Sequence, residues 1–204
     1  MKKLILSSSL SLLFIVIFSS CQKEVNSPQS GSSSNIEGNW KFISISLKSE
    51  VIDVITDGPD VIKSVSNSDY TSINNKGNIL IDATQWKSTA ISYDVSTTLY
   101  AKFYENGTLV DSLQQGLDIT LPPYNSTSTY QRIGNDSLYF PNGSFVSLGD
   151  SPGSQTKPSG CKFRIEGNRM IINVLINETT QDNSQGIQQI TTKKGTGSVV
   201  LEKQ

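Results

Sequence analysis

Residues 98–109, TLYAKFYENGTL, carry the pattern that decides the fold. Successive side chains of a β-strand point to opposite faces, so Tyr100 and Tyr104 share one face while Phe103 lies on the other. The Asn106-Gly107 step that follows favours a two-residue hairpin turn, because both turn positions need a positive φ. The stretch therefore predicts a strand, a tight turn and a second, antiparallel strand.

The same two-residue periodicity continues on both sides of this hairpin. It predicts strands over residues 40–47, 51–56, 61–66, 78–83, 89–95, 98–104, 130–133, 138–140, 163–165, 170–172, 187–193 and 198–202. Further hairpin turns are predicted where glycine stands in a short polar break, at residues 57–60, 134–135, 167–168 and 194–197. Residues 50–66 fit strands least well and could instead form one or two short helices.

About a dozen short strands in one domain must close on themselves or stack, because open strand edges invite aggregation. We therefore expect an all-β fold, an antiparallel meander closed into a barrel, with a β-sandwich as the alternative. Residues 141–160, PNGSFVSLGDSPGSQTKPSG, are rich in Pro and Gly and predict one long irregular loop.

The N-terminus has the features of an export signal. Residues 1–20 combine two lysines with an apolar run that is shorter than the roughly 20 residues of a membrane span. The run ends at Ser19-Ser20-Cys21, which resembles the lipobox of bacterial lipoproteins and implies cleavage before Cys21 and acylation of its thiol. Residues 21–35 are polar and Ser-rich, so we expect a flexible tether to a single folded domain at residues 36–204.

The composition excludes several classes of function. The chain has 204 residues, no histidine, two cysteines and a formal net charge of −1. Ser-His-Asp catalysis, Cys-His catalysis and His-ligated zinc all require histidine. A chain with almost no net charge has no strong electrostatic field to attract nucleic acid. The oxygen-rich turns at residues 57–60 and 182–184 lack the full calcium-loop pattern. We expect no enzyme, no metal and no cofactor.

Gly38-Asn39-Trp40 opens the first predicted strand, directly after the tether. This start resembles that of the lipocalin and fatty-acid-binding superfamily, and the chain is similar to lipocalin-like lipoproteins of Gram-negative bacteria. The resemblance implies a barrel with Trp40 packed at one end, held in the cell envelope by lipid, at the outer membrane. The final predicted strand carries no arginine to stack on Trp40, as many lipocalins have.

Two functions follow from this architecture. In the first, the barrel holds a small apolar or amphipathic ligand, and the candidate lining residues are Tyr93, Tyr100, Phe103, Tyr104 and Tyr139. In the second, the barrel is filled and its loops or edges contact an envelope protein or a glycan. Both versions are anchored to the membrane through Cys21 and do no chemistry.

Two short motifs resemble a bacterial periplasmic O-glycosylation acceptor. These are Asp111-Ser112-Leu113 and Asp136-Ser137-Leu138. The resemblance implies that Ser112 and Ser137 are candidate modification sites.

Overall fold

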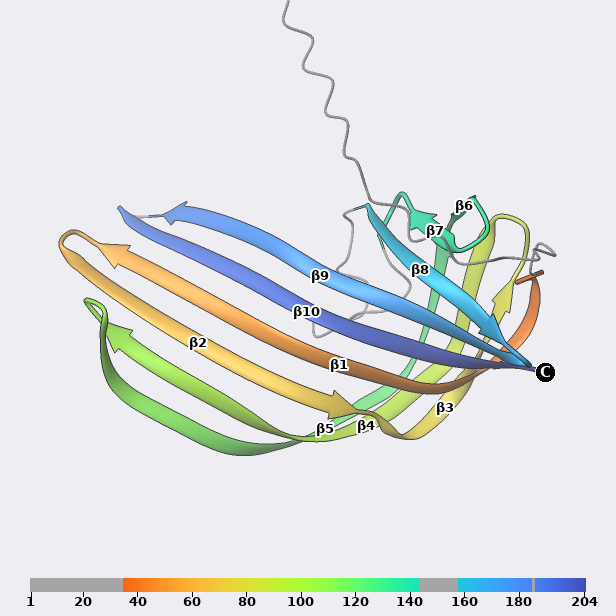
Figure 1. Cartoon of the computed structure of the whole chain (residues 1–204), viewed down its shortest axis with the longest axis horizontal. Coiled ribbons are helices and arrows are strands. Elements are labelled where there is room, and N and C mark those ends of the chain that lie inside the picture. Colours follow the sequence, from red (N-terminus) through yellow and green to blue (C-terminus); the bar gives the residue numbers. More distant parts are fainter. Residues whose placement is uncertain (1–34, 144–157, 185) are drawn as a thin grey trace, which may run out of the picture. The chain divides into compact units, whose positions relative to one another are not determined.

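The computed structural model describes residues 35–143, 158–184 and 186–204 (Figure 1). Residues Ser33–Gln204 form one compact unit. The predicted signal segment, Cys21, residues 22–34 of the tether and residues 144–157 of the Pro/Gly-rich loop lie outside the described residues.

The described residues form ten strands and no helix. The strands are β1 (Gly38–Asp57), β2 (Asp60–Thr71), β3 (Ile73–Ile81), β4 (Gln85–Glu105), β5 (Thr108–Thr129), β6 (Gln131–Ile133), β7 (Ser137–Phe140), β8 (Ser159–Glu166), β9 (Arg169–Ser184) and β10 (Ile187–Lys203). The prediction of an all-β fold is confirmed, and the short helices considered for residues 50–66 do not form.

All ten strands belong to one antiparallel sheet, so the two stacked sheets of a sandwich are not observed. β5 pairs with β4, and β4 pairs with both β2 and β3, which lie end to end beside β1. From β1 the sheet continues through β10, β9, β8 and β7 to β6. The break between β2 and β3 falls at Ser72, whose backbone N–H donates to the Ile45 carbonyl at 2.8 Å.

The sheet curls round at one end, where the chain itself links its two edges. Gln85 of β4 pairs with Thr129 of β5. The backbone N–H of the next residue, Tyr130, donates to the Thr84 carbonyl. The residue after that, Gln131, belongs to β6 and pairs with Tyr139 of β7. The chain therefore passes from one edge of the sheet to the other within three residues. We call this part of the sheet the ring end.

Away from the ring end the described strands do not close. Of the 16 residues of β9, only residues 169–173 pair with β8. The side of β5 away from β4 has no ladder partner among the described residues. Figure 1 shows β1, β2, β9 and β10 continuing past the ring end as long ribbons that run side by side. The predicted antiparallel meander is therefore confirmed, whereas the described strands do not form a fully closed barrel.

The hydrophobic core fills the ring end. Its large, fully buried side chains are Trp40, Trp86, Phe140, Ile36, Ile45, Ile79, Ile81, Leu138, Met170, Ile172, Leu201 and Val199. The Trp86 and Phe140 rings meet edge to face with centroids 6.1 Å apart, a geometry that aromatic pairs prefer. The core therefore draws on strands from the start, the middle and the end of the chain.

The structure corrects the predicted strand lengths. Three predicted pairs of short strands are single long ones: β1 has 20 residues, β4 has 21 and β10 has 17. The predicted turn at residues 194–197 is wrong, because β10 runs straight through it. A Cβ on Gly195 would lie 2.9 Å from the Lys48 carbonyl oxygen, and one on Gly197 2.6 Å from that of Ser46, so these glycines permit close strand approach.

The other predicted hairpin turns are confirmed. Residues 57–60 join β1 to β2, and Gly134 and Gly167 each adopt a φ of 62° in their turns. Asn106 and Gly107 have φ values of 49° and 83°, the two positive values that a type I′ turn requires.

Gly77 offers a test of the packing at the ring end. Its φ is +114°, and a Cβ there would lie 2.7 Å from the Ile91 Cα. We expect Gly77→Ala to lower the free energy of unfolding by about 1–3 kcal/mol, because it adds backbone strain and a clash with main-chain atoms. Urea unfolding followed by tryptophan fluorescence measures the change.

Gly116→Ala is the matched control for this substitution. Gly116 lies in β5 with no positive φ, and an added Cβ would meet nothing within 4 Å. Its free energy of unfolding should stay within about 0.5 kcal/mol of the wild-type value. Equal losses in the two variants would show that the contact with Ile91 is not the cause.

Candidate functional site

The site is built on the part of the sheet that extends beyond the ring end. We call residues 48–57, 60–71, 96–105, 108–120, 174–184 and 187–196 the distal sheet. Its inner face is the one that continues the rows of core side chains, and its outer face is the opposite one. Each row crosses the strands through directly opposed residues, as in Leu113, Ala101, Ser66, Val51, Lys193 and Glu178.

Side-chain contacts agree with this assignment of faces. On the inner face the Ser49 and Ser68 hydroxyls lie 2.9 Å apart, and the Thr191 hydroxyl donates to the Asp53 carboxylate. On the outer face the Lys63 ammonium lies 5.7 Å from the centroid of the Tyr104 ring. The register of the strands therefore fixes which side chains share a surface.

A small apolar void lies among the core side chains of the described residues. The void between the core and the inner face measures about 10 Å³, and its lining consists of Phe42, Ile45, Ile79, Ser88, Ile91, Tyr93, Tyr124 and Val199. Pockets that hold small organic ligands usually measure about 300–1,000 Å³. The described residues therefore form a filled core at the ring end of the sheet.

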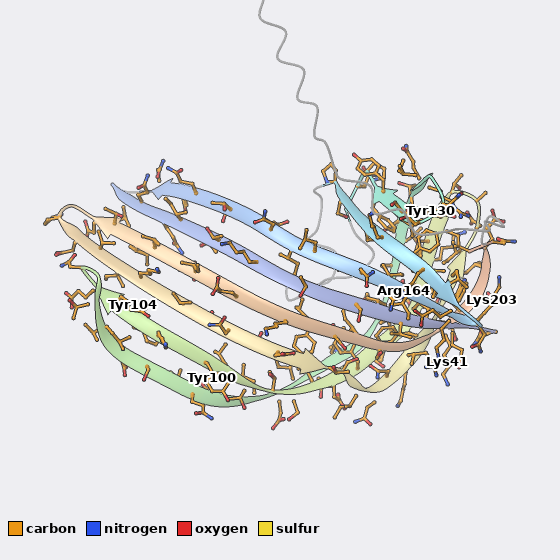
Figure 2. All side chains as sticks on the ribbon, in the orientation of Figure 1. Lys41, Tyr100, Tyr104, Tyr130, Arg164 and Lys203 are labelled. Atoms are coloured by element: carbon orange, nitrogen blue, oxygen red, sulfur yellow. The ribbon has the colours of Figure 1, made fainter. Side chains whose placement is uncertain are left out.

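The five aromatic residues predicted to line a ligand cavity do not come together. Tyr93 is buried in the core, where its ring centroid lies 5.8 Å from that of Phe42. Phe103 lies half-buried on the inner face, whereas Tyr100 and Tyr104 project from the outer face of β4 (Figure 2). Tyr139 is exposed on β7. The face assignments predicted for residues 100–104 are confirmed, and they separate these side chains.

Trp40 lies in the core with 1% of its surface exposed. Its indole N–H donates to the Ile36 carbonyl at 2.8 Å, and the Lys203 ammonium lies 5.3 Å from its ring centroid. Lys203 also donates to the Asn35 carbonyl at 3.3 Å. The final strand has no arginine to stack on Trp40, but its Lys203 supplies a cation at that place. The sequence signal was a lysine at the end of the final strand.

The inner face of the distal sheet exposes apolar side chains. Leu113 and Ile119 of β5 are 43% and 53% exposed, and Ile62 of β2 is 51% exposed. Leu99 and Phe103 of β4 lie half-buried on the same face. These residues continue the buried row of Val95 and Ala101. The apolar surface therefore runs outward from the core without a covering element among the described residues.

Charge is divided unequally between the two faces. The inner face carries seven carboxylates, from Asp53, Asp57, Asp60, Glu105, Asp111, Glu178 and Asp182, and one ammonium group, from Lys193. The outer face carries three carboxylates, from Glu50, Asp69 and Asp118, and four ammonium groups, from Lys48, Lys63, Lys102 and Lys194. The inner face is thus strongly acidic, whereas the outer face is nearly balanced.

A shallow polar hollow of about 260 Å³ lies on the outer face. Its side chains come mainly from Ser46, Lys48, Asp69, Thr196 and Ser198. The hollow lies where Gly197 brings β10 close to β1. Hydroxyl, ammonium and carboxylate groups are mixed there, so the hollow favours no single ligand charge.

The carboxylates with lowered pKa values accept hydrogen bonds that stabilise a turn and a pair of neighbouring strands. Asp82 accepts hydrogen bonds from the backbone N–H groups of Thr84 and Gln85, which lower its pKa. The Asn74 side chain donates to Asp94 at 2.7 Å and lowers the pKa of that carboxyl. Burial raises the pKa of the Cys161 thiol to about 12, which keeps it protonated and weakly nucleophilic.

The two predicted glycosylation motifs have different surroundings. Ser112 is exposed on the outer face of β5, and its backbone N–H donates to the Asp111 carboxylate at 2.7 Å. Ser137 is half-buried at the start of β7, and its hydroxyl donates to Asp136 at 2.9 Å. Modification of either serine stays a prediction.

Within the described residues no helix is long and apolar enough to cross a membrane. In the same part of the chain, no three Cys, Asp or Glu side chains gather closely enough to hold a metal ion. The inner-face carboxylates are therefore spread along the sheet rather than collected at one point.

Comparison with known proteins gives little guidance. No protein-family model matches the chain, and no curated protein matches it. Among solved structures, it is similar to the translocator domain of the autotransporter NalP from Neisseria meningitidis, with 8% identity and a TM-score of 0.23, over 81% of this chain and 90% of that one.

A second similar structure is Ail, the attachment invasion locus protein of Yersinia pestis, with 9% identity and a TM-score of 0.18, over 81% of this chain and 99% of that one. The complex of Ail with the heparin analogue sucrose octasulfate matches with 8% identity and the same TM-score.

Sequence reasoning missed the acidic inner face. Asp53, Glu105 and Glu178 are far apart in the chain, and only the strand register brings them to one surface. The sequence signal was the even spacing of Asp53 and Asp57, which puts both carboxylates on one face once residues 38–57 are known to form a single strand.

Two tyrosines at the boundary between core and inner face predict alkaline instability. Burial, with Tyr93 adding to it, raises the pKa of both Tyr70 and Tyr124 to about 12. Below pH 10 these groups are protonated in the folded and unfolded chain alike. Between pH 10 and 12 the unfolded chain loses the protons and the folded chain keeps them, so stability should fall as the pH rises.

Thermal unfolding followed by circular dichroism across this pH range measures the effect. The double variant Tyr70→Phe, Tyr124→Phe should lose stability less steeply than the wild type between pH 10 and 12. An identical slope in the two proteins would contradict the assignment.

Proposed function

We propose that this chain is a lipid-anchored protein of the cell envelope, at the outer membrane, that binds another protein on its distal sheet and catalyses no reaction. The observation that carries the proposal is the exposed apolar inner face, which has no covering element among the described residues. Exposed apolar surfaces with polar rims commonly mark protein interaction sites.

The filled core supports this function over that of a small-ligand carrier. The void at the ring end is about 10 Å³, which is room for about one water molecule. The position of Trp40 in the core supports the lipocalin-like relationship inferred from Gly38-Asn39-Trp40. In this proposal the chain has kept the start of such a barrel and has lengthened its strands into an interaction surface.

Membrane attachment rests on the residues around Cys21. A diacylglycerol thioether and an N-acyl chain together supply more than one hydrocarbon anchor, and two anchoring signals are enough for stable binding. The polar residues that follow, up to residue 35, would extend to at most about 45 Å. The folded unit would therefore work within reach of the membrane surface.

Cys21→Ser tests the anchor directly. We expect the wild-type chain to partition with membranes and to incorporate labelled fatty acid, because the acylated thiol is the proposed attachment point. The variant should incorporate none and should appear in the soluble fraction. Cys161→Ser is the control and should leave labelling unchanged, since that thiol lies inside the folded unit. Equal labelling of Cys21→Ser and the wild type would contradict lipidation at this residue.

Site-specific photo-crosslinking in the native host tests the interaction face. A photoreactive amino acid at Leu113, on the inner face, should give a discrete crosslinked species. The same group at Leu175, which is 73% exposed on the outer face, should not. Crosslinking from Leu175 alone, or from neither position, would contradict an interaction site on the inner face.

Native mass spectrometry of the lipid-free unit separates partner binding from ligand transport. Residues 33–204, purified from a bacterial periplasm, should show the mass of the bare chain. A stoichiometric additional mass that is lost on unfolding would instead support the carrier function.

A further inference from the structure

We propose that the inner face of the distal sheet binds a basic amphipathic helix of a partner protein. This inference rests on the proposed function, since it names the chemistry of the partner that would occupy the same face. Three observations carry it: an apolar strip on β4 and β5, a border of carboxylates, and the near absence of cations on this face.

The apolar strip is continuous along two neighbouring strands. Leu113 stands directly opposite Ala101, and Ile119 stands opposite Val95. Directly opposed side chains in an antiparallel pair have Cβ atoms about 4.5–5.5 Å apart, and their diagonal neighbours remain within reach of long side chains. Ala101 and Val95 are buried, whereas Leu113 and Ile119 are about half exposed, so the strip presents an accessible outer margin.

Carboxylates lie at the distal end of this strip. Asp111 lies beside Phe103, and Glu105 lies beside Ile62 at the end of β4. Asp57 and Asp60 face each other at the β1–β2 hairpin. Across the sheet, β9 adds Glu178 and Asp182. An occupant of the strip would therefore have negative charge at its distal end, with the carboxylates of β9 farther away across the sheet.

The charge balance of the inner face favours a positively charged partner. Seven carboxylates and one ammonium group on the inner face would repel an anionic lipid surface or a nucleic acid. The same charges attract lysine and arginine side chains, and charge complementarity of this kind also speeds association. Within the described residues no three acidic side chains converge as a metal site would require, so an extended cationic partner fits better than a single ion.

The geometry of the face favours a helix over a strand. A strand would add to the free edge of β5 or β9, where only alternate side chains would meet the inner face. A helix laid along the strip buries its apolar stripe against it. Lysines and arginines of the helix then reach the carboxylates at the distal end of the strip, among them Glu105 and Asp111.

Fluorescence anisotropy with a synthetic probe tests the inference. The probe is a labelled helix of about 18 residues, or five turns, made of leucine and lysine in an amphipathic order. The protein is the lipid-free unit, residues 33–204, which contains the whole core. We expect saturable binding that weakens as salt is raised, because exposed charge pairs are screened.

Two triple variants of equal charge change form the matched comparison. Asp60→Asn, Glu105→Gln, Asp111→Asn removes three negative charges from the inner face. Glu50→Gln, Asp69→Asn, Asp118→Asn removes three from the outer face. The first should weaken binding by about tenfold or more, and the second by no more than about twofold. Far-UV circular dichroism establishes that both variants fold.

A second pair of variants tests the apolar strip. Leu113→Thr, Ile119→Thr should weaken binding of the probe at least about fivefold, because both side chains contribute exposed apolar surface to the inner face. Leu109→Thr, Leu175→Thr changes two exposed leucines on the outer face and should leave binding unchanged. Two control probes complete the set: one with glutamate for every lysine, and one with the same composition in a non-amphipathic order.

The inference is overturned if the Leu/Lys helix does not bind, if both triple variants weaken it equally, or if the non-amphipathic probe binds as tightly. Such a result combined with photo-crosslinking from Leu113 would leave the proposed interaction face in place with a partner of different chemistry. Failure of the crosslinking as well would remove the proposed function itself.

Discussion

The pairing of β1 with β10 is the constraint on which the rest of the structure depends. The two strands are in register from Trp40 opposite Lys203 to Thr56 opposite Gln188, with a single irregularity near Phe42. Because side chains alternate along a strand, a shift of one residue would send every inward side chain to the other face. Trp40, Ile45, Val199 and Leu201 are all buried inward, so the core penalises any such shift. The same register then places Asp53 and Lys193 on the inner face, far from the core.

Local turn chemistry was predictable from the sequence, whereas strand length was not. Asn106-Gly107 specifies its turn through the φ values that those two residues tolerate, and the structure has that turn. Lys194-Gly195-Thr196-Gly197 has a similar composition and lies inside a strand, because glycine serves close backbone approach as readily as a turn. Ser49, Ser66 and Ser68 occupy the inner face and interrupt the hydrophobic alternation. The sequence pattern therefore did not show that β1 and β2 continue through the distal sheet.

The candidate site was harder to predict than the fold for a related reason. A core residue reveals itself through its own apolar side chain, but a surface is defined by neighbours that only the register supplies. Glu105 and Ile62 are 43 positions apart in sequence and directly opposed in the sheet. The aromatic residues singled out as ligand contacts were chosen for their chemistry alone, and the alternation of β4 sends Tyr100 and Tyr104 to the face opposite Phe103.

The position of the chain ends has a mechanical consequence. Residue 35 leads into β1, and the opposite end of β1 is the hairpin at Asp57 and Asp60. If a lipid anchor holds one end while a bound partner pulls near the hairpin, the load runs along β1. Its hydrogen bonds to β10 and β2 lie across the direction of pull, so they are strained together and not opened one after another. The long strands would thus resist extension under a force applied between the membrane and the partner.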